Sequence, residues 1–217
     1  MSNFPTVMNK SDLTDALASS KIQETANNVG VSFLKMDFES GEWLLGQSND
    51  IVTDEEVHIL TDSIQHGWIL WSGGRPNKSF VRFNQPLPQA MESIGEDVPA
   101  EARSFQGALV DNGDMLSFDT NSYGGRKGVD TLLGAIKSHA AEGSQFLYPK
   151  IKLSSDSYAN KKRGGKLTYN PLFEIVSWFD ENGVEESGAA PQVEDKAVDA
   201  DDDEPDQRQR RVRKSAA

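Results

Sequence analysis

Residues 105–118 read FQGALVDNGDMLSF and carry the clearest fold signal in the chain. Two runs rich in β-forming residues flank Asn112-Gly113, a dipeptide that suits the tight turn of a β-hairpin because both of its residues tolerate a positive φ. The pattern therefore predicts two antiparallel strands joined at this turn.

Further β signals lie on both sides of this hairpin. Residues 31–46, VSFLKMDFESGEWLLG, predict a second hairpin with Gly41 in its turn. Residues 148–153 alternate between apolar and polar side chains, and residues 171–179, PLFEIVSWF, form another β-rich run. The polar stretch between these last two runs predicts a solvated connection.

The remaining stretches are less regular. A short buried strand is expected at residues 68–71, before Gly73-Gly74, while residues 54–65 are ambiguous between strand and helix. Helices are predicted at residues 12–28 and at residues 128–141, where apolar side chains recur at helical spacing.

Strands outnumber helices, at about seven against two, which favours a mainly β fold with minor α. We therefore predict an OB-like β-barrel with insertions, closed or partly closed, as one domain over residues 1–180. Residues 181–217 are predicted to form a disordered acidic tail with a basic end, because low hydrophobicity combined with high charge cannot offset the entropy of ordering the chain.

Composition excludes several classes of protein. The chain of 217 residues has no cysteine and only three histidines, which excludes a disulfide framework and a cysteine-based zinc site. No catalytic motif of recognised spacing is present, so we expect no enzyme, no cofactor and no metal. The apolar runs are shorter than a membrane span or a signal peptide requires, which favours a cytoplasmic protein.

The net charge of −12 is unevenly distributed. Residues 1–125 hold 18 acidic and 7 basic side chains, whereas residues 126–166 hold 9 basic and only 3 acidic ones. The positive region begins with GGRKG, residues 124–128, which resembles a phosphate-binding loop but lacks the Ser or Thr that should follow Lys127. Contact with a phosphate and a plain turn before the helix both stay open.

All four tyrosines lie in this positive region, interleaved with its basic residues. Single-stranded nucleic acid needs cations for its phosphates and flat rings for its bases, so we predict a binding surface there. Solvating lysines on a hairpin, with tyrosines placed by β-propensity, are the alternative. Trp71 is a weaker candidate ring, and Trp178 is assigned to the core. The predicted contacts are Tyr123, Arg126, Lys127, Tyr148, Lys150, Lys152, Tyr158, Lys161, Lys162, Arg163, Lys166 and Tyr169.

A β-rich body followed by the acidic stretch DADDDEPD, residues 199–206, resembles the single-stranded DNA-binding proteins of bacteriophages and other mobile elements. Residues 147–178 are also similar to closing hairpins of small phage-encoded proteins. The tail departs from that class, since it ends in RQRRVRKSAA without a terminal aromatic residue.

The resemblance implies a non-enzymatic protein of DNA replication or recombination in the cytoplasm of a bacterial host. Its partners would be single-stranded DNA and replication or recombination proteins that the tail recruits. The tail either competes with DNA for the basic surface or serves solubility. The alternative function is a protein-interaction module or inhibitor, a DNA mimic that uses the acidic residues 1–125 to bind a host protein.

Overall fold

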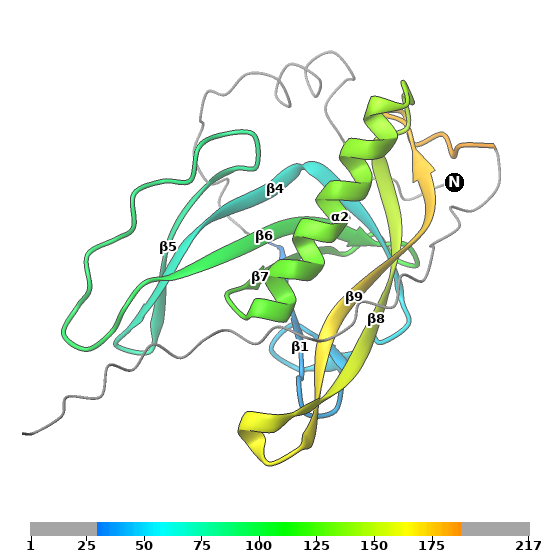
Figure 1. Cartoon of the computed structure of the whole chain (residues 1–217). Coiled ribbons are helices and arrows are strands. Elements are labelled where there is room, and N and C mark those ends of the chain that lie inside the picture. Colours follow the sequence, from blue (N-terminus) through cyan, green and yellow to red (C-terminus); the bar gives the residue numbers. More distant parts are fainter. Residues whose placement is uncertain (1–29, 188–217) are drawn as a thin grey trace, which may run out of the picture.

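The computed structural model describes residues 30–187 (Figure 1). The predicted helix over residues 12–28 and the tail from residue 188 onward lie outside the described residues. Within the described part, nine strands form one sheet and one α-helix packs against it. The elements are β1 (Ser32–Met36), β2 (Trp43–Leu45), β3 (Asp50–Ile51), β4 (Glu56–Ser72), β5 (Arg75–Arg82), β6 (Ala100–Leu109), β7 (Met115–Thr120), α2 (Tyr123–Ala141), β8 (Tyr148–Asn160), the 3-10 turn η1 (Lys161–Arg163) and β9 (Lys166–Phe179).

The strands follow the order β3-β2-β1-β7-β6-β4-β8-β9, and β5 pairs with β4 beside this path. Among the described strands only β1 and β7 pair in parallel, and the other strand pairs are antiparallel. The sheet curls into a half-barrel (Figure 1). The predicted mainly β fold with minor α, in a partly closed barrel, is confirmed.

Both predicted hairpins are present. β1 pairs with β2 around a turn in which Gly41 has a φ of 79°. β6 pairs with β7 around Asn112-Gly113, and the Gly113 φ is 75°. The turn residues therefore decide the local topology as their backbone preferences predict.

Strand β4 corrects the prediction for the region before it. The ambiguous residues 54–65 and the short strand expected at 68–71 belong largely to this one 17-residue strand. Its register against β6 shifts between Leu60 and Gln65, where Ser63 Oγ accepts a hydrogen bond from the Gln106 backbone at 2.7 Å. This bulge interrupts the period of two that a strand shows in sequence.

The helix corrects the prediction for GGRKG. α2 begins at Tyr123, five residues before the predicted start, so the glycine run lies inside its first turns. A Cβ on Gly124 would lie 1.9 Å from Asn170 Oδ1, and one on Gly128 would lie 3.0 Å from the Pro171 carbonyl oxygen. The glycines therefore let the helix pack closely on β9, which explains them without a phosphate loop.

The core lies between the concave face of the sheet and α2. Phe105, Phe118 and Phe173 form an aromatic cluster with centroid distances of 5.3–5.7 Å. Val129 and Ile136 of α2 belong to the same buried cluster. Burying this face of the helix is the main force that holds it to the sheet.

Strands β8 and β9 are longer than predicted, because residues of the expected polar connection extend both strands to a turn at residues 161–165. After β9 the chain turns back. Phe179 forms a bridge with Glu185, and the Glu186 amide donates to the Trp178 carbonyl at 2.8 Å. Residues 180–187, which we call the return segment, were predicted partly as tail and instead pair with β9.

Candidate nucleic-acid interface

The structure divides the predicted binding residues into three groups and one core residue. The helix start comprises Tyr123, Arg126 and Lys127 at the beginning of α2. Lys150 and Lys152 lie on β8, and Tyr148 at the start of that strand is buried. The finger is the outer part of the β8–β9 hairpin, residues 156–170, which projects beyond the sheet in yellow in Figure 1 and holds Tyr158, Lys161, Lys162, Arg163, Lys166 and Tyr169.

Tyr148 is a correction to the predicted set. Its side chain is only 2% exposed and is among the largest fully buried side chains. Burial, with the carboxylates of Asp62 and Glu181 nearby, raises the pKa of its phenol well above the usual value. A ring enclosed in this way packs in the core and does not stack on a base from solvent.

Lys150 and Lys152 do not join the helix start. They alternate along β8 with Ile151 and Leu153, which lie in the core that α2 covers, so the two lysines point to the opposite face of the sheet. Lys150 Nζ lies 3.2 Å from Glu56 Oε2, and Lys152 Nζ lies 2.9 Å from an oxygen of Asp54. The predicted patch is therefore not continuous, and these two cations are partly neutralised.

The finger carries its basic residues at the tip. Lys161 and Lys166 are exposed, and within residues 30–187 neither forms an ion pair. Lys162 lies beside them in η1, and the turn closes with Gly164 and Gly165 at positive φ. Tyr158, 44% exposed, faces solvent on the strand that leads into this turn. The tip thus combines cations with an accessible ring.

The finger is anchored to the turn between β1 and β2 at two points, Arg163 in η1 and Tyr169 on β9. Arg163 forms an ion pair with Glu39, and its guanidinium lies 5.2 Å from the centre of the Phe38 ring. The Tyr169 amide donates to the Phe38 carbonyl at 2.9 Å, and the Tyr169 ring packs on Gly41. Arg163 and Tyr169 were predicted as nucleic-acid contacts, and here they also hold the finger in place.

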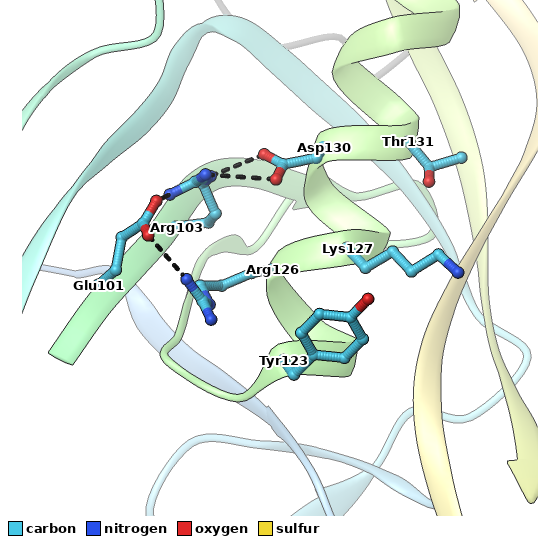
Figure 2. A pocket seen from close by; sticks show the side chains of 7 residues that line it. All are labelled: Glu101, Arg103, Tyr123, Arg126, Lys127, Asp130 and Thr131. Atoms are coloured by element: carbon cyan, nitrogen blue, oxygen red, sulfur yellow. Dashed lines mark hydrogen bonds and ion pairs between the residues drawn. The ribbon is translucent and has the colours of Figure 1, made fainter. Parts of the chain in front are cut away.

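The helix start opens onto a pocket (Figure 2). Glu101 bridges two arginines, since its Oε1 accepts from Arg103 at 2.8 Å and its Oε2 accepts from Arg126 at 2.9 Å. The hydrogen bond from Arg103 holds the pKa of the Glu101 carboxyl below its usual value, so the bridge stays ionised. The pocket is lined by Glu101, Arg103, Tyr123, Arg126, Lys127, Asp130 and Thr131.

The two remaining residues of the helix start are accessible. Tyr123 is 74% exposed, and Lys127 is exposed with no ion pair to any residue of the described chain. The first turn of α2 contains no acidic residue, so the positive end of the helix dipole adds to these cations. Gly124 touches Asn170 of β9, which places the helix start against the base of the finger.

Four pocket residues were missed from sequence, namely Glu101, Arg103, Asp130 and Thr131. The spacing was the available signal. Glu101 and Arg103 are two residues apart on β6 and so share one face of the strand. Asp130 and Thr131 follow Arg126 by about one helical turn and so lie near it on α2. Trp71 is 54% exposed at the end of β4, whereas its apolar neighbours suggested the core. Trp178 is buried as predicted.

Comparisons with protein-family models, with curated proteins and with solved structures give no match. Residues 30–187 contain no helix with the length and apolarity that a membrane crossing needs. The same part of the chain has no group of three or more side chains arranged to hold a metal ion.

Proposed function

We propose that this chain is a single-stranded DNA-binding protein that acts in DNA replication or recombination, of the kind that bacteriophages encode. One observation carries the proposal. Three cations without ion pairs in the described chain, Lys127, Lys161 and Lys166, lie at the helix start and the adjoining finger, together with the exposed rings of Tyr123 and Tyr158.

This combination suits an unpaired strand better than a duplex. The lysines attract phosphates of either form, but an exposed tyrosine ring gains stacking energy only from a base that is not already stacked and paired. Each stacked base contributes about 1–3 kcal/mol, independently of its identity. A strand that crosses from the finger to the helix start would meet both kinds of side chain.

The ion pairs also limit the number of phosphate contacts. Arg126, Lys150, Lys152 and Arg163 are each paired with a carboxylate, so among the patch residues whose side chains the structure describes, the three unpaired lysines are expected to release counterions fully. For single strands the logarithm of the binding constant should then fall with the logarithm of salt concentration at a slope of about −2.

Fluorescence anisotropy with labelled oligo(dT) and a matched duplex, over a series of salt concentrations, tests the proposal. We expect tighter binding of the single strand, with quenching of protein fluorescence. The triple variant Lys127→Ala, Lys161→Ala, Lys166→Ala should lose most of the affinity, and its salt slope should flatten by about 2. Lys137→Ala, an exposed lysine about 15 Å further along α2, is the matched control and should bind like the parent.

The protein-interaction module remains the second candidate because of exposed apolar side chains. They occur at the end of β4 and along the loop after β5, and exposed apolar groups are typical of protein contacts. If oligo(dT) fails to bind at any salt concentration, this candidate replaces the first. The residues are Trp71, Leu87, Ile94 and Val98.

A further inference from the structure

Strand β9 lies at one end of the sheet, and part of its outer edge is open. The Tyr169 amide donates to the turn between β1 and β2, and a Cβ on Gly128 of α2 would lie 3.0 Å from the Pro171 carbonyl oxygen, so neighbouring elements cover the edge there. At the other end, the Trp178 carbonyl accepts from the return segment. Between these two points, residues 172–177 form no backbone hydrogen bond on the outer edge to any residue that the structure describes.

This open stretch presents hydrogen-bonding groups to its outer side, because backbone groups on successive residues of a strand point to opposite edges. Leu153 of β8 is the register partner of Phe173, but its N–H and C=O bond to residues 54 and 55, on the side away from β9. Phe173 therefore points its own N–H and C=O away from β8, and by the same alternation so does Ile175. An edge with such groups is a template for a further strand.

The return segment already begins such a strand. Two backbone hydrogen bonds, from Asp180 to Val184 at 3.0 Å and from Glu186 to Trp178 at 2.8 Å, frame an antiparallel bridge at the end of β9. The Glu186 carboxylate also lies 3.3 Å from Nε2 of His139, which holds the segment against α2. The chain is therefore turned back along the outer edge of β9, toward the open stretch.

The sequence that follows Glu186 fits the open stretch in length and in chemistry. Residues 187–191 read SGAAP, and they match the open residues 172–177, which hold one extra residue at the bulge of Val176. Counted from Glu186, whose N–H faces β9, the N–H groups of residues 188 and 190 would also face β9, and those of residues 187, 189 and 191 would face away. Pro191 therefore falls where its missing N–H costs no hydrogen bond.

We propose that residues 188–191 add an antiparallel strand to the open edge of β9. This strand continues the pairing that the return segment begins, and it gives partners to the outward backbone groups of Phe173 and Ile175. The occupant is a segment of the same chain, because the described residues end on this edge and point along it.

The added strand would also direct the acidic tail to the helix start. Phe173, at the far end of the open stretch, packs on Gly128, where a Cβ would lie 3.2 Å from its ring, and Gly128 directly follows Lys127. The acidic stretch, residues 199–206, begins eight residues after Pro191. The strand itself does not depend on DNA binding, whereas its effect on the DNA-binding surface rests on the proposed function.

Amide hydrogen exchange of the full chain, followed residue by residue by NMR, tests the strand. The inward variant, Gly188→Pro with Ala190→Pro, removes both N–H groups that would face β9. We expect the amides of Phe173 and Ile175 to be protected in the parent and to exchange at least about tenfold faster in the inward variant.

The outward variant, Ser187→Pro with Ala189→Pro, is the matched control. It carries the same number of new prolines, but at positions whose N–H groups would face away from β9, so the amides of Phe173 and Ile175 should exchange as in the parent. The amides of Leu172 and Glu174 point to β8 and should stay protected in both variants, which shows that the sheet is folded.

Two results overturn the strand: fast exchange of both outward amides in the parent, or the same exchange in the inward and outward variants. The oligo(dT) titration at low salt is read separately. Because the strand confines the acidic stretch near the helix start, the inward variant should bind at least about twofold more tightly than the outward variant. Equal affinities, with the exchange pattern upheld, would overturn the effect on DNA binding and leave the strand in place. If not even the parent binds oligo(dT), the proposed function fails, and the exchange result alone decides the strand.

Discussion

The two long hairpins of the sheet, β4–β5 and β8–β9, are built alike and differ in how many of their cations are accessible. Both extend well past the core and close through a pair of glycines at positive φ. In β4–β5 the ring of Trp71 is exposed near the turn, while Lys78 forms an ion pair with Asp119. The aromatic group is accessible and this cation is neutralised.

In β8–β9 two cations are accessible, and one aromatic ring is packed against a neighbouring turn. Tyr169 packs on Gly41 at the base of the finger, and Lys161 and Lys166 at the tip have no ion pair within the described residues. A hairpin that outgrows the core is therefore not by itself a sign of nucleic-acid binding. Arg75 beside the β4–β5 turn is also exposed and has no ion pair within the described residues, so the hairpins differ in the number of accessible cations, with two lysines at the tip of β8–β9.

The largest expected effect concerns how β4–β5 is assembled. A Cβ on Gly67 would lie 2.0 Å from the Ser79 carbonyl oxygen and 2.8 Å from Phe80 Cα, so backbone must move. We expect Gly67→Ala to lower the free energy of unfolding by about 3 kcal/mol, measured by urea denaturation. Gly134→Ala, where a Cβ meets nothing within 4 Å, is the control and should stabilise the helix by about 0.5–1 kcal/mol. Equal stability of both variants would contradict the close approach of the two strands.

The next effect tests whether accessible cations on β8–β9 are targets for the acidic tail. Deletion of residues 188–217 should strengthen oligo(dT) binding several-fold at low salt, where screening is weak, and less at high salt. Removal of residues 207–217 alone leaves the acidic stretch in place and should not strengthen binding. Unchanged affinity after the full deletion would assign the tail to solubility.

A smaller effect separates the accessible Lys161 of the finger tip from the anchored Arg163 in the same turn. Lys161→Ala should leave stability within about 0.5 kcal/mol of the parent, yet weaken oligo(dT) binding and flatten the salt slope by about 0.7. Arg163→Ala should lower the melting temperature, because Arg163 contacts Glu39 and the Phe38 ring. If the two variants show the same change in melting temperature, the distinction between an accessible and an anchored cation in this turn is wrong.

The smallest effect is expected at Trp71. Trp68 pairs with Glu101 of the pocket, so its side chain lies on the same face of the sheet as Glu101. Trp71 is three residues further along β4, so its side chain points to the opposite face. Trp71→Ala should therefore keep oligo(dT) affinity within about twofold in the anisotropy titration. A loss of affinity as large as that of Lys161→Ala would extend the binding surface to β4–β5.

Local turn chemistry made much of this sheet predictable. The hairpins at residues 31–46 and 105–118 follow from Gly41 and from Asn112-Gly113, because these residues specify the turn without help from distant parts of the chain. Strand β4 was not predictable as one unit. Its bulge near Ser63 interrupts the alternation of side chains that marks a strand in sequence. Its length depends on pairing with three strands, β5, β6 and β8, that lie elsewhere in the chain.

The candidate site was harder to predict, because neighbours in sequence separate in space. Lys150 and Arg126 both lie in the one basic region of the chain, but the pleat of β8 sends Lys150 to the face away from α2. The glycines at 124–128 suggested an anion loop, whereas Asn170 and Pro171, more than 40 residues later, account for them. Contacts over such separations leave no mark in a local pattern.

The return segment fixes the point from which the last 30 residues of the chain depart. Glu186 lies 3.3 Å from His139 Nε2 near the end of α2, while Arg126 of the pocket lies 13 residues earlier on this helix, about 20 Å away. The acidic stretch begins 12 residues after Ser187, and a chain of that length spans at most about 40 Å. The stretch can therefore reach the helix start with length to spare, so the anchoring of the return segment leaves room for the competition between tail and DNA that the tail deletion tests.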